Sequence, residues 1–146
     1  KCILNDQSLL VKKYAILSLI DIMNYVDADR SELSRLFEDL TQKDDISITA
    51  SGFKGLYMMG DKEHLNNIIN LLITEDYRDR CTVVNILEDI PENDNRDLIL
   101  SALTKLRKTE KSEAVNSIID KFINESQKDY IIGDIKNGSD WEGAKE

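Results

Sequence analysis

The chain has 146 residues, of which 28 are acidic and 19 basic, so its formal net charge is −9. This length suits one domain, which buries roughly 70% of the surface that the unfolded chain exposes. The negative charge argues against non-specific binding to nucleic acid or to an anionic membrane, because phosphate groups are repelled. No apolar run approaches the roughly 20 residues of a membrane span. Two cysteines are too few for a disulfide framework, so we expect a reducing, cytoplasmic location.

The first 60 residues predict three helices. Apolar residues recur at helical spacing over 9–26, and Ser8 is placed to cap this helix. A second apolar stripe spans 31–40 and a third spans 46–59, with aspartates in the turns between them. Gly60 is expected to end the third helix in a left-handed conformation, which glycine adopts without steric cost.

Four further helices are predicted, and their apolar stripes lie within residues 65–72, 77–90, 98–106 and 114–123. Pro91, the only proline, ends the fifth helix in a polar loop. After Ser126 the apolar pattern decays. We therefore expect a helical domain over 1–126 and a polar C-terminal tail over 127–146, either irregular or with a short helix docked on the domain.

Three of the predicted helices begin with the same local pattern, in the segments 11–15, 46–50 and 77–81. Each segment starts on an apolar residue and ends on a small one, namely Ala15, Ala50 and Cys81, which are 35 and 31 positions apart. A small side chain in mid-helix lets a neighbouring helix approach closely, as the stacking of similar units requires. A second helix follows each of these three, so the repeating unit is a helix pair.

This pattern resembles the HEAT-like repeats of the PBS-lyase type. The similarity is carried by the segment Gly60-Asp61-Lys62-Glu63-His64-Leu65-Asn66-Asn67-Ile68-Ile69-Asn70-Leu71-Leu72 and by its continuation through Glu75-Asp76-Tyr77-Arg78 to Cys81. It is closest over 44–90, fainter over 9–43 and faintest over 94–125, where the Gly-Asp turn is missing. The resemblance implies an all-α, right-handed solenoid of three to four stacked antiparallel helix pairs, whose second helices line a concave face.

The polar faces of these second helices are the candidate partner-binding surface. Its residues are Arg35, Glu38, Gln42, Glu63, Asn66, Asn67, Asn70, Ser101, Thr104 and Lys108. Asparagine is a weak helix former, and Glu, Lys or Ala would stabilise a plain solvent-facing helix better than the three asparagines do. An ordinary solvated face is the simpler explanation of this amide row, and a hydrogen-bonding surface is the alternative.

The residues that could carry chemistry each have a structural explanation. His64 is the only histidine and cannot complete a zinc site alone, so an exposed position in a first helical turn is expected. Cys81 fills a small-residue position and is expected to be buried. Segment 27–38 has the oxygen spacing of a calcium loop, but Glu32 stands where the turn needs glycine, and Arg35 is a cation at a ligand position. We therefore expect no catalytic site, metal or cofactor.

These observations favour a non-catalytic protein–protein interaction module that binds a basic protein partner on the concave face. A bacterial immunity-type protein that neutralises a toxin would fit, by analogy of fold alone. A segment of a longer scaffold would fit too, because the first residue is Lys1 and not Met. The alternative is a nucleic-acid-acting enzyme or reader of the helical-repeat DNA glycosylase type. That function needs a basic groove, whereas the predicted face sets Arg35 and Lys108 against Glu38 and Glu63.

Overall fold

The chain folds into helices throughout the part that the computed structural model describes, which is residues 8–91 and 95–143, with the side chains of 129, 130 and 133–143 left aside. The elements are α2 (Leu9–Ile22), α3 (Arg30–Leu40), α4 (Ile46–Met58), α5 (His64–Asn70), the 3-10 turn η1 (Leu71–Ile73), α6 (Tyr77–Glu88), α7 (Arg96–Thr109) and α8 (Glu113–Gly143). No strand occurs in these residues, so the expected all-α class is confirmed.

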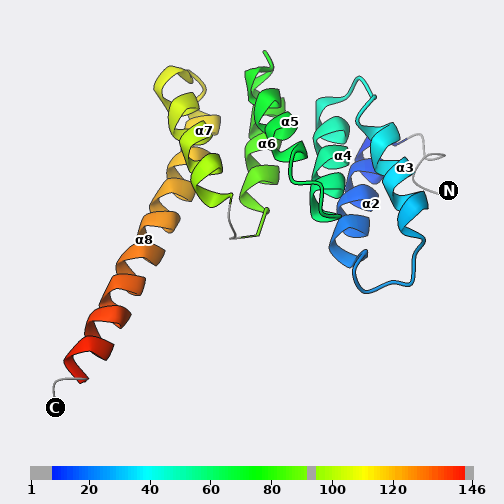
Figure 1. Cartoon of the computed structure of the whole chain (residues 1–146). Coiled ribbons are helices and arrows are strands. Elements are labelled where there is room, and N and C mark those ends of the chain that lie inside the picture. Colours follow the sequence, from blue (N-terminus) through cyan, green and yellow to red (C-terminus); the bar gives the residue numbers. More distant parts are fainter. Residues whose placement is uncertain (1–7, 92–94, 144–146) are drawn as a thin grey trace.

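The helices form an open stack in chain order (Figure 1). One row contains α2, α4, α6 and α8, each in contact with the next. Of the remaining helices, α3 packs on α4, α5 packs on both α4 and α6, and α7 packs on α8. The stack runs from the α2–α3 end to the α7–α8 end, and α8 projects beyond it. The helices are therefore not gathered around one axis as in a closed bundle.

Local sequence signals set most helix ends. Each of Ser8, Asp29, Asp45 and Asp76 has extended backbone at an N-cap and accepts a hydrogen bond from an amide two or three residues later. At the other end of α4, Gly60 has φ +117°, so its left-handed conformation is confirmed. The Gly60 amide donates to the Tyr57 carbonyl and the Asp61 amide to the Leu56 carbonyl, which satisfies two terminal carbonyls of α4.

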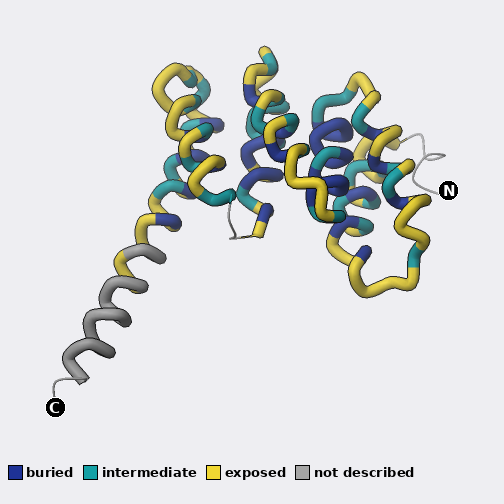
Figure 2. The backbone as a smooth tube through the Cα atoms, viewed as in Figure 1, coloured by how far each residue is buried: buried dark blue, intermediate teal, exposed yellow. Residues whose placement is uncertain are grey.

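Helix α4 is the most buried element and joins two apolar clusters (Figure 2). Ile48 and Leu56 pack with residues of α2 and α3, whereas Ala50 and Tyr57 pack with residues of α5, α6, α7 and α8. Its glycines allow α3 to approach closely. A Cβ added at Gly55 would overlap the Phe37 ring, and one at Gly52 would lie 2.8 Å from the Phe37 carbonyl oxygen. Helices α3 and α4 therefore lie so close together at Gly52 and Gly55 that no larger side chain fits at these positions.

The small residues expected at the helix contacts differ in burial. Ala50 is fully buried, as stacking requires, whereas Ala15 and Cys81 are half-buried. Cys81 packs against the cluster that α4 shares with α5–α8. Close packing at this repeat position is therefore strongest at the centre of the stack.

The backbone after Ser126 differs from the expected tail. α8 does not end there but continues as one helix to Gly143. Residues 127–132 contain neither proline nor glycine, and a glycine inside a helix, such as Gly133 or Gly138, costs only about 1 kcal/mol. The loss of the apolar stripe marks where α8 leaves the stack rather than where the helix ends.

Candidate functional site

The predicted binding residues all lie on or beside the helices that pack against the central row. Arg35 and Glu38 lie on α3, and Gln42 follows it. Glu63 directly precedes α5, which carries Asn66, Asn67 and Asn70. Ser101, Thr104 and Lys108 lie on α7. Their side chains are exposed except that of Asn67, which is half-buried. The helices thus present three separate polar rows, one from each pair.

The His64 side chain is held in a local network, contrary to the expectation of an exposed residue. Its Nδ1 lies 3.1 Å from the Asn67 amide nitrogen, and its Nε2 lies 3.1 Å from an Asp61 oxygen. The Phe53 ring stacks on the imidazole with centroids 5.6 Å apart. This pattern puts the imidazole proton on Nε2, because Nδ1 accepts from Asn67. Asn67 therefore helps to hold His64 against Asp61, in the turn before α5. Of the three asparagines, only Asn66 and Asn70 are exposed.

Helices α4, α6 and α8 share one hydrogen-bond pattern at their N-termini. Thr49, Arg80 and Asn116 each donate from the side chain to a carbonyl six residues earlier, at Lys43, Thr74 and Glu110. These donors lie four residues after Asp45, Asp76 and Ser112, respectively. The backbone amide of each donor also donates to the carbonyl of that earlier residue. The repeat seen in the sequence at 46–50 and 77–81 thus has a structural counterpart that extends to α8.

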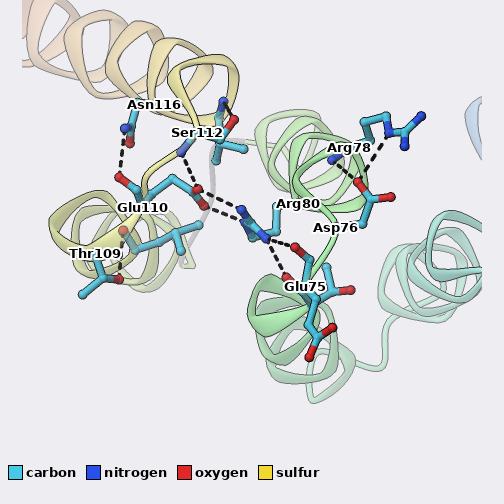
Figure 3. A network of polar contacts seen from close by, with 11 residues as sticks. Glu75, Asp76, Arg78, Arg80, Thr109, Glu110, Ser112 and Asn116 are labelled. Atoms are coloured by element: carbon cyan, nitrogen blue, oxygen red, sulfur yellow. Dashed lines mark hydrogen bonds and ion pairs between the residues drawn. The ribbon is translucent and has the colours of Figure 1, made fainter.

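A bidentate ion pair joins α6 to the turn between α7 and α8 (Figure 3). Arg80 donates from Nε and Nη2 to the two Glu110 carboxylate oxygens at 2.6 and 2.9 Å, and from Nη1 to the carbonyls of Thr74 and Glu75. Glu110 also accepts from the Ser112 amide. The Arg80 hydrogen bond lowers the pKa of Glu110 and raises that of Arg80. This pair connects the α6 N-terminus to the α7–α8 turn and is structural.

This pair borders a groove between η1 and the C-terminal half of α7. Two adjoining cavities of about 300 and 340 Å³ share Leu72, Ile73, Leu106 and Thr109 as lining residues. Ile69, Asn70, Ala102 and Lys105 complete one cavity, and Thr74, Arg80, Glu110 and Lys111 complete the other. Ile73 is 89% exposed at the edge of this groove. We call these residues the η1–α7 groove.

The groove was not predicted from the sequence, although Asn70 was among the candidate residues. Ile73 follows Ile69 by four positions and therefore continues the apolar stripe of a regular α-helix. The chain instead tightens to a 3-10 turn at Leu71–Ile73, which has three residues per turn and rotates Ile73 out of the core. The apolar spacing itself gave no signal of this turn, which only the structure shows.

A second cavity of about 490 Å³ lies between α7 and α8. Leu100, Thr104, Ile123, Ser126, Gln127 and Ile131 line it. The candidate residue Thr104 therefore belongs to this cavity and not to the η1–α7 groove. Of the three predicted α7 residues, only Thr104 lines one of these cavities, whereas Ser101 and Lys108 line none of them.

Charge is unevenly distributed over the candidate surface. Lys105 and Lys111 line the η1–α7 groove, and the only carboxylate that lines it, Glu110, is paired with Arg80. Glu38 and Glu63, by contrast, are exposed at α3 and at the start of α5. The two acidic residues of the predicted surface thus both lie in its α3–α5 half, where Arg35 and Lys62 are exposed as well.

Three other features of the described residues bear on function, namely the thiol of Cys81, the grouping of metal-ligating side chains and the apolar character of the helices. Burial raises the pKa of the Cys81 thiol, and the Glu110 carboxylate raises it further, so the thiol stays protonated near neutral pH. Among the residues described, no three His, Cys, Asp or Glu side chains are grouped closely enough to hold a metal ion. No described helix is both long and apolar enough to cross a membrane.

Comparison with protein-family models, with curated proteins and with solved structures gives no match to this chain. The candidate site is therefore defined by its own geometry.

Proposed function

We propose that this chain is a non-catalytic module that binds a protein partner on the face formed by α3, α5, η1 and α7. The η1–α7 groove carries this proposal. It offers apolar walls beside Ile73, an exposed isoleucine, and polar atoms from Asn70 and Thr109 at its rim. An exposed apolar hollow bordered by polar groups is typical of a site that receives side chains of another protein.

The partner we propose is a basic protein whose cationic surface faces the α3–α5 half. Glu38, Asp39, Asp61 and Glu63 are exposed there. Lys105 and Lys111 would repel a cation at the other end, so the groove itself would receive apolar side chains. This division fixes the orientation in which the partner binds. An immunity-type protein that neutralises a toxin and a scaffold segment are both compatible with such a surface.

The local chemistry of the described residues supports binding over catalysis. Both ring nitrogens of His64 are occupied, by Asp61 and Asn67, so this imidazole has no free lone pair to act as a general base. Arg80 and Glu110 neutralise each other. A nucleic-acid function would in addition need an extended basic groove, whereas the lysines near η1 share their face with the carboxylates of α3 and α5.

Affinity capture from an extract of the source cells tests this proposal. Ile73→Asp places a charge at the groove and is expected to abolish capture of a specific protein. Leu98→Asp is the matched control, because Leu98 is an exposed apolar residue of α7 that does not line the groove. Circular dichroism should show the same helix content in both variants. Equal capture by the two variants, or retention of duplex DNA instead of a protein, would overturn the proposal.

A further inference from the structure

Helix α2 is apolar on the side that faces the stack and also on the side that faces away from it. Ile16 and Ile20 are buried against α3 and α4. Seven exposed large apolar residues lie on α2 and in the turn that follows it: Leu9, Leu10, Val11, Tyr14, Ile22, Tyr25 and Val26. Tyr14 is 65% and Tyr25 88% exposed. Helix surfaces that meet solvent in stacked repeats are normally polar, so this exposed apolar surface is unusual.

The outer stripe of α2 has a symmetric spacing. It consists of Val11, Tyr14, Ser18 and Ile22 on α2 and of Tyr25 in the turn that follows, which are separated by three, four, four and three positions. Ser18 lies at the centre and is small, and an apolar pair lies on each side of it. A helix that runs antiparallel would meet this stripe with the same spacing, so the surface is complementary to itself.

The charge distribution also favours a second copy of this chain as the molecule that covers α2. Two copies of a chain with net charge −9 repel each other wherever carboxylates meet. The α2 stripe contains no charged residue, and Asp21 is the one exposed charge on this helix. A second copy can therefore approach here with little electrostatic cost, whereas a basic partner would find almost nothing to pair with.

We propose that two copies of this chain associate through α2 as an antiparallel pair, with the twofold axis at Ser18. Val11 then lies beside Tyr25 of the partner subunit, and Tyr14 beside Ile22 of the partner subunit. Each of these contacts joins an aromatic ring to a branched aliphatic side chain. The small Ser18 side chains let the two helices come close together at the crossing point. The row of α2, α4, α6 and α8 would continue into the second copy.

Sedimentation equilibrium of the full chain over a range of concentrations tests the association. The average mass should rise from 16.7 kDa towards twice that value. Tyr14→Glu should weaken the dimer at least tenfold, and Leu98→Asp should leave it unchanged. Added salt should strengthen the dimer, because it screens the repulsion between two acidic chains. A mass that stays at one chain, or a dimer that Tyr14→Glu does not weaken, would overturn the proposal.

Cross-linking tests the register independently. In a background of Cys2→Ser and Cys81→Ala, Ser18→Cys should form a disulfide between two copies under mild oxidation, because the twofold axis brings residue 18 next to its counterpart. Ser101→Cys, an exposed position on α7, is the control and should form no disulfide between copies, although it associates through α2 like the parent. A Ser18→Cys chain that cross-links no faster than the control would exclude this register. Neither result depends on the η1–α7 groove, so failure here leaves the proposed function standing.

Discussion

A few side chains hold successive helix pairs together, and Glu110 does so most directly. Its side chain is 2% exposed and that of Arg80 is 16% exposed, so the pair is largely shielded from solvent screening. Arg80 also binds the carbonyls of Thr74 and Glu75. The pair therefore fixes the turns before α6 and α8 relative to each other. It also fixes the part of the η1–α7 groove that Thr74, Arg80 and Glu110 line.

Glu110→Gln should destabilise the chain by about 2 kcal/mol, because it leaves a shielded guanidinium without a counter-charge. The pH dependence gives a second readout. The folded pKa of Glu110 lies below its ordinary value of 4.5, so the stabilisation is present above that value and is lost as pH falls through the folded pKa. Urea unfolding between pH 3 and 7 should show a smaller loss of stability on acidification in Glu110→Gln than in the parent. Identical slopes would contradict the assignment.

Replacing Glu88 should stabilise the chain, in contrast to replacing Glu110. Burial raises its pKa, and its buried Oε1 has no hydrogen-bond partner among the described residues. A raised folded pKa means that the stabilising contribution is present at acidic pH and is lost as pH rises through the folded value. Glu88→Gln should therefore stabilise the chain at pH 7 by up to about 1 kcal/mol, with the gain shrinking at acidic pH. Thermal unfolding at both pH values checks this, and a destabilised variant at pH 7 would refute it.

At the scale of elements, the contact between α3 and α4 depends on two glycines. Gly55→Ala should cost about 1–3 kcal/mol, although alanine favours a helix, because the added methyl group overlaps the buried Phe37 ring. The double variant Gly55→Ala/Phe37→Leu should recover part of this loss, since leucine leaves room for the methyl group. Chemical unfolding of the parent chain and of these two variants measures both effects. A Gly55→Ala chain as stable as the parent would show that α3 and α4 do not meet so closely.

Helices and caps could be predicted because they depend on local sequence. Asp45 and Gly60 set the ends of α4 through hydrogen bonds to nearby backbone groups, and both positions were recognisable. Features that depend on tertiary contacts could not be predicted. The exposure of Ile73 follows from a change of helical period at η1, and the network of His64 requires Phe53 from the preceding helix. The continuation of α8 past Ser126 was missed because apolar periodicity reports burial and not helix length.

At the scale of the whole molecule, α4 connects the two apolar clusters of the described stack. The proposed binding face and the proposed dimer surface lie on different elements, so one chain could use both. Handedness and curvature follow from the HEAT-like resemblance alone and stay predictions. On the proposed binding face, Glu38 and Glu63 lie in the α3–α5 half and Lys105 and Lys111 lie at the η1–α7 groove, so the charge of this face differs between its two halves.

This difference in charge predicts how association with the basic partner should respond to mutation. Glu38→Lys/Glu63→Lys should slow association about tenfold at low salt, because it removes attraction before contact, and the difference should shrink at high salt. Lys105→Glu is the opposite change at the other end of the face and should not slow association. Stopped-flow or surface-based kinetics with the captured partner measure these rates. Unchanged rates in Glu38→Lys/Glu63→Lys would remove the electrostatic part of the proposal.

The most direct test of the binding face is hydrogen–deuterium exchange on the chain, free and in complex with the captured partner. We predict slower exchange in the complex over residues 64–74 and 101–109, which contain the walls of the η1–α7 groove, and unchanged exchange over the outer helix α2. Slowed exchange confined to α2, or to the far part of α8, with no change at η1 and α7, would contradict the account.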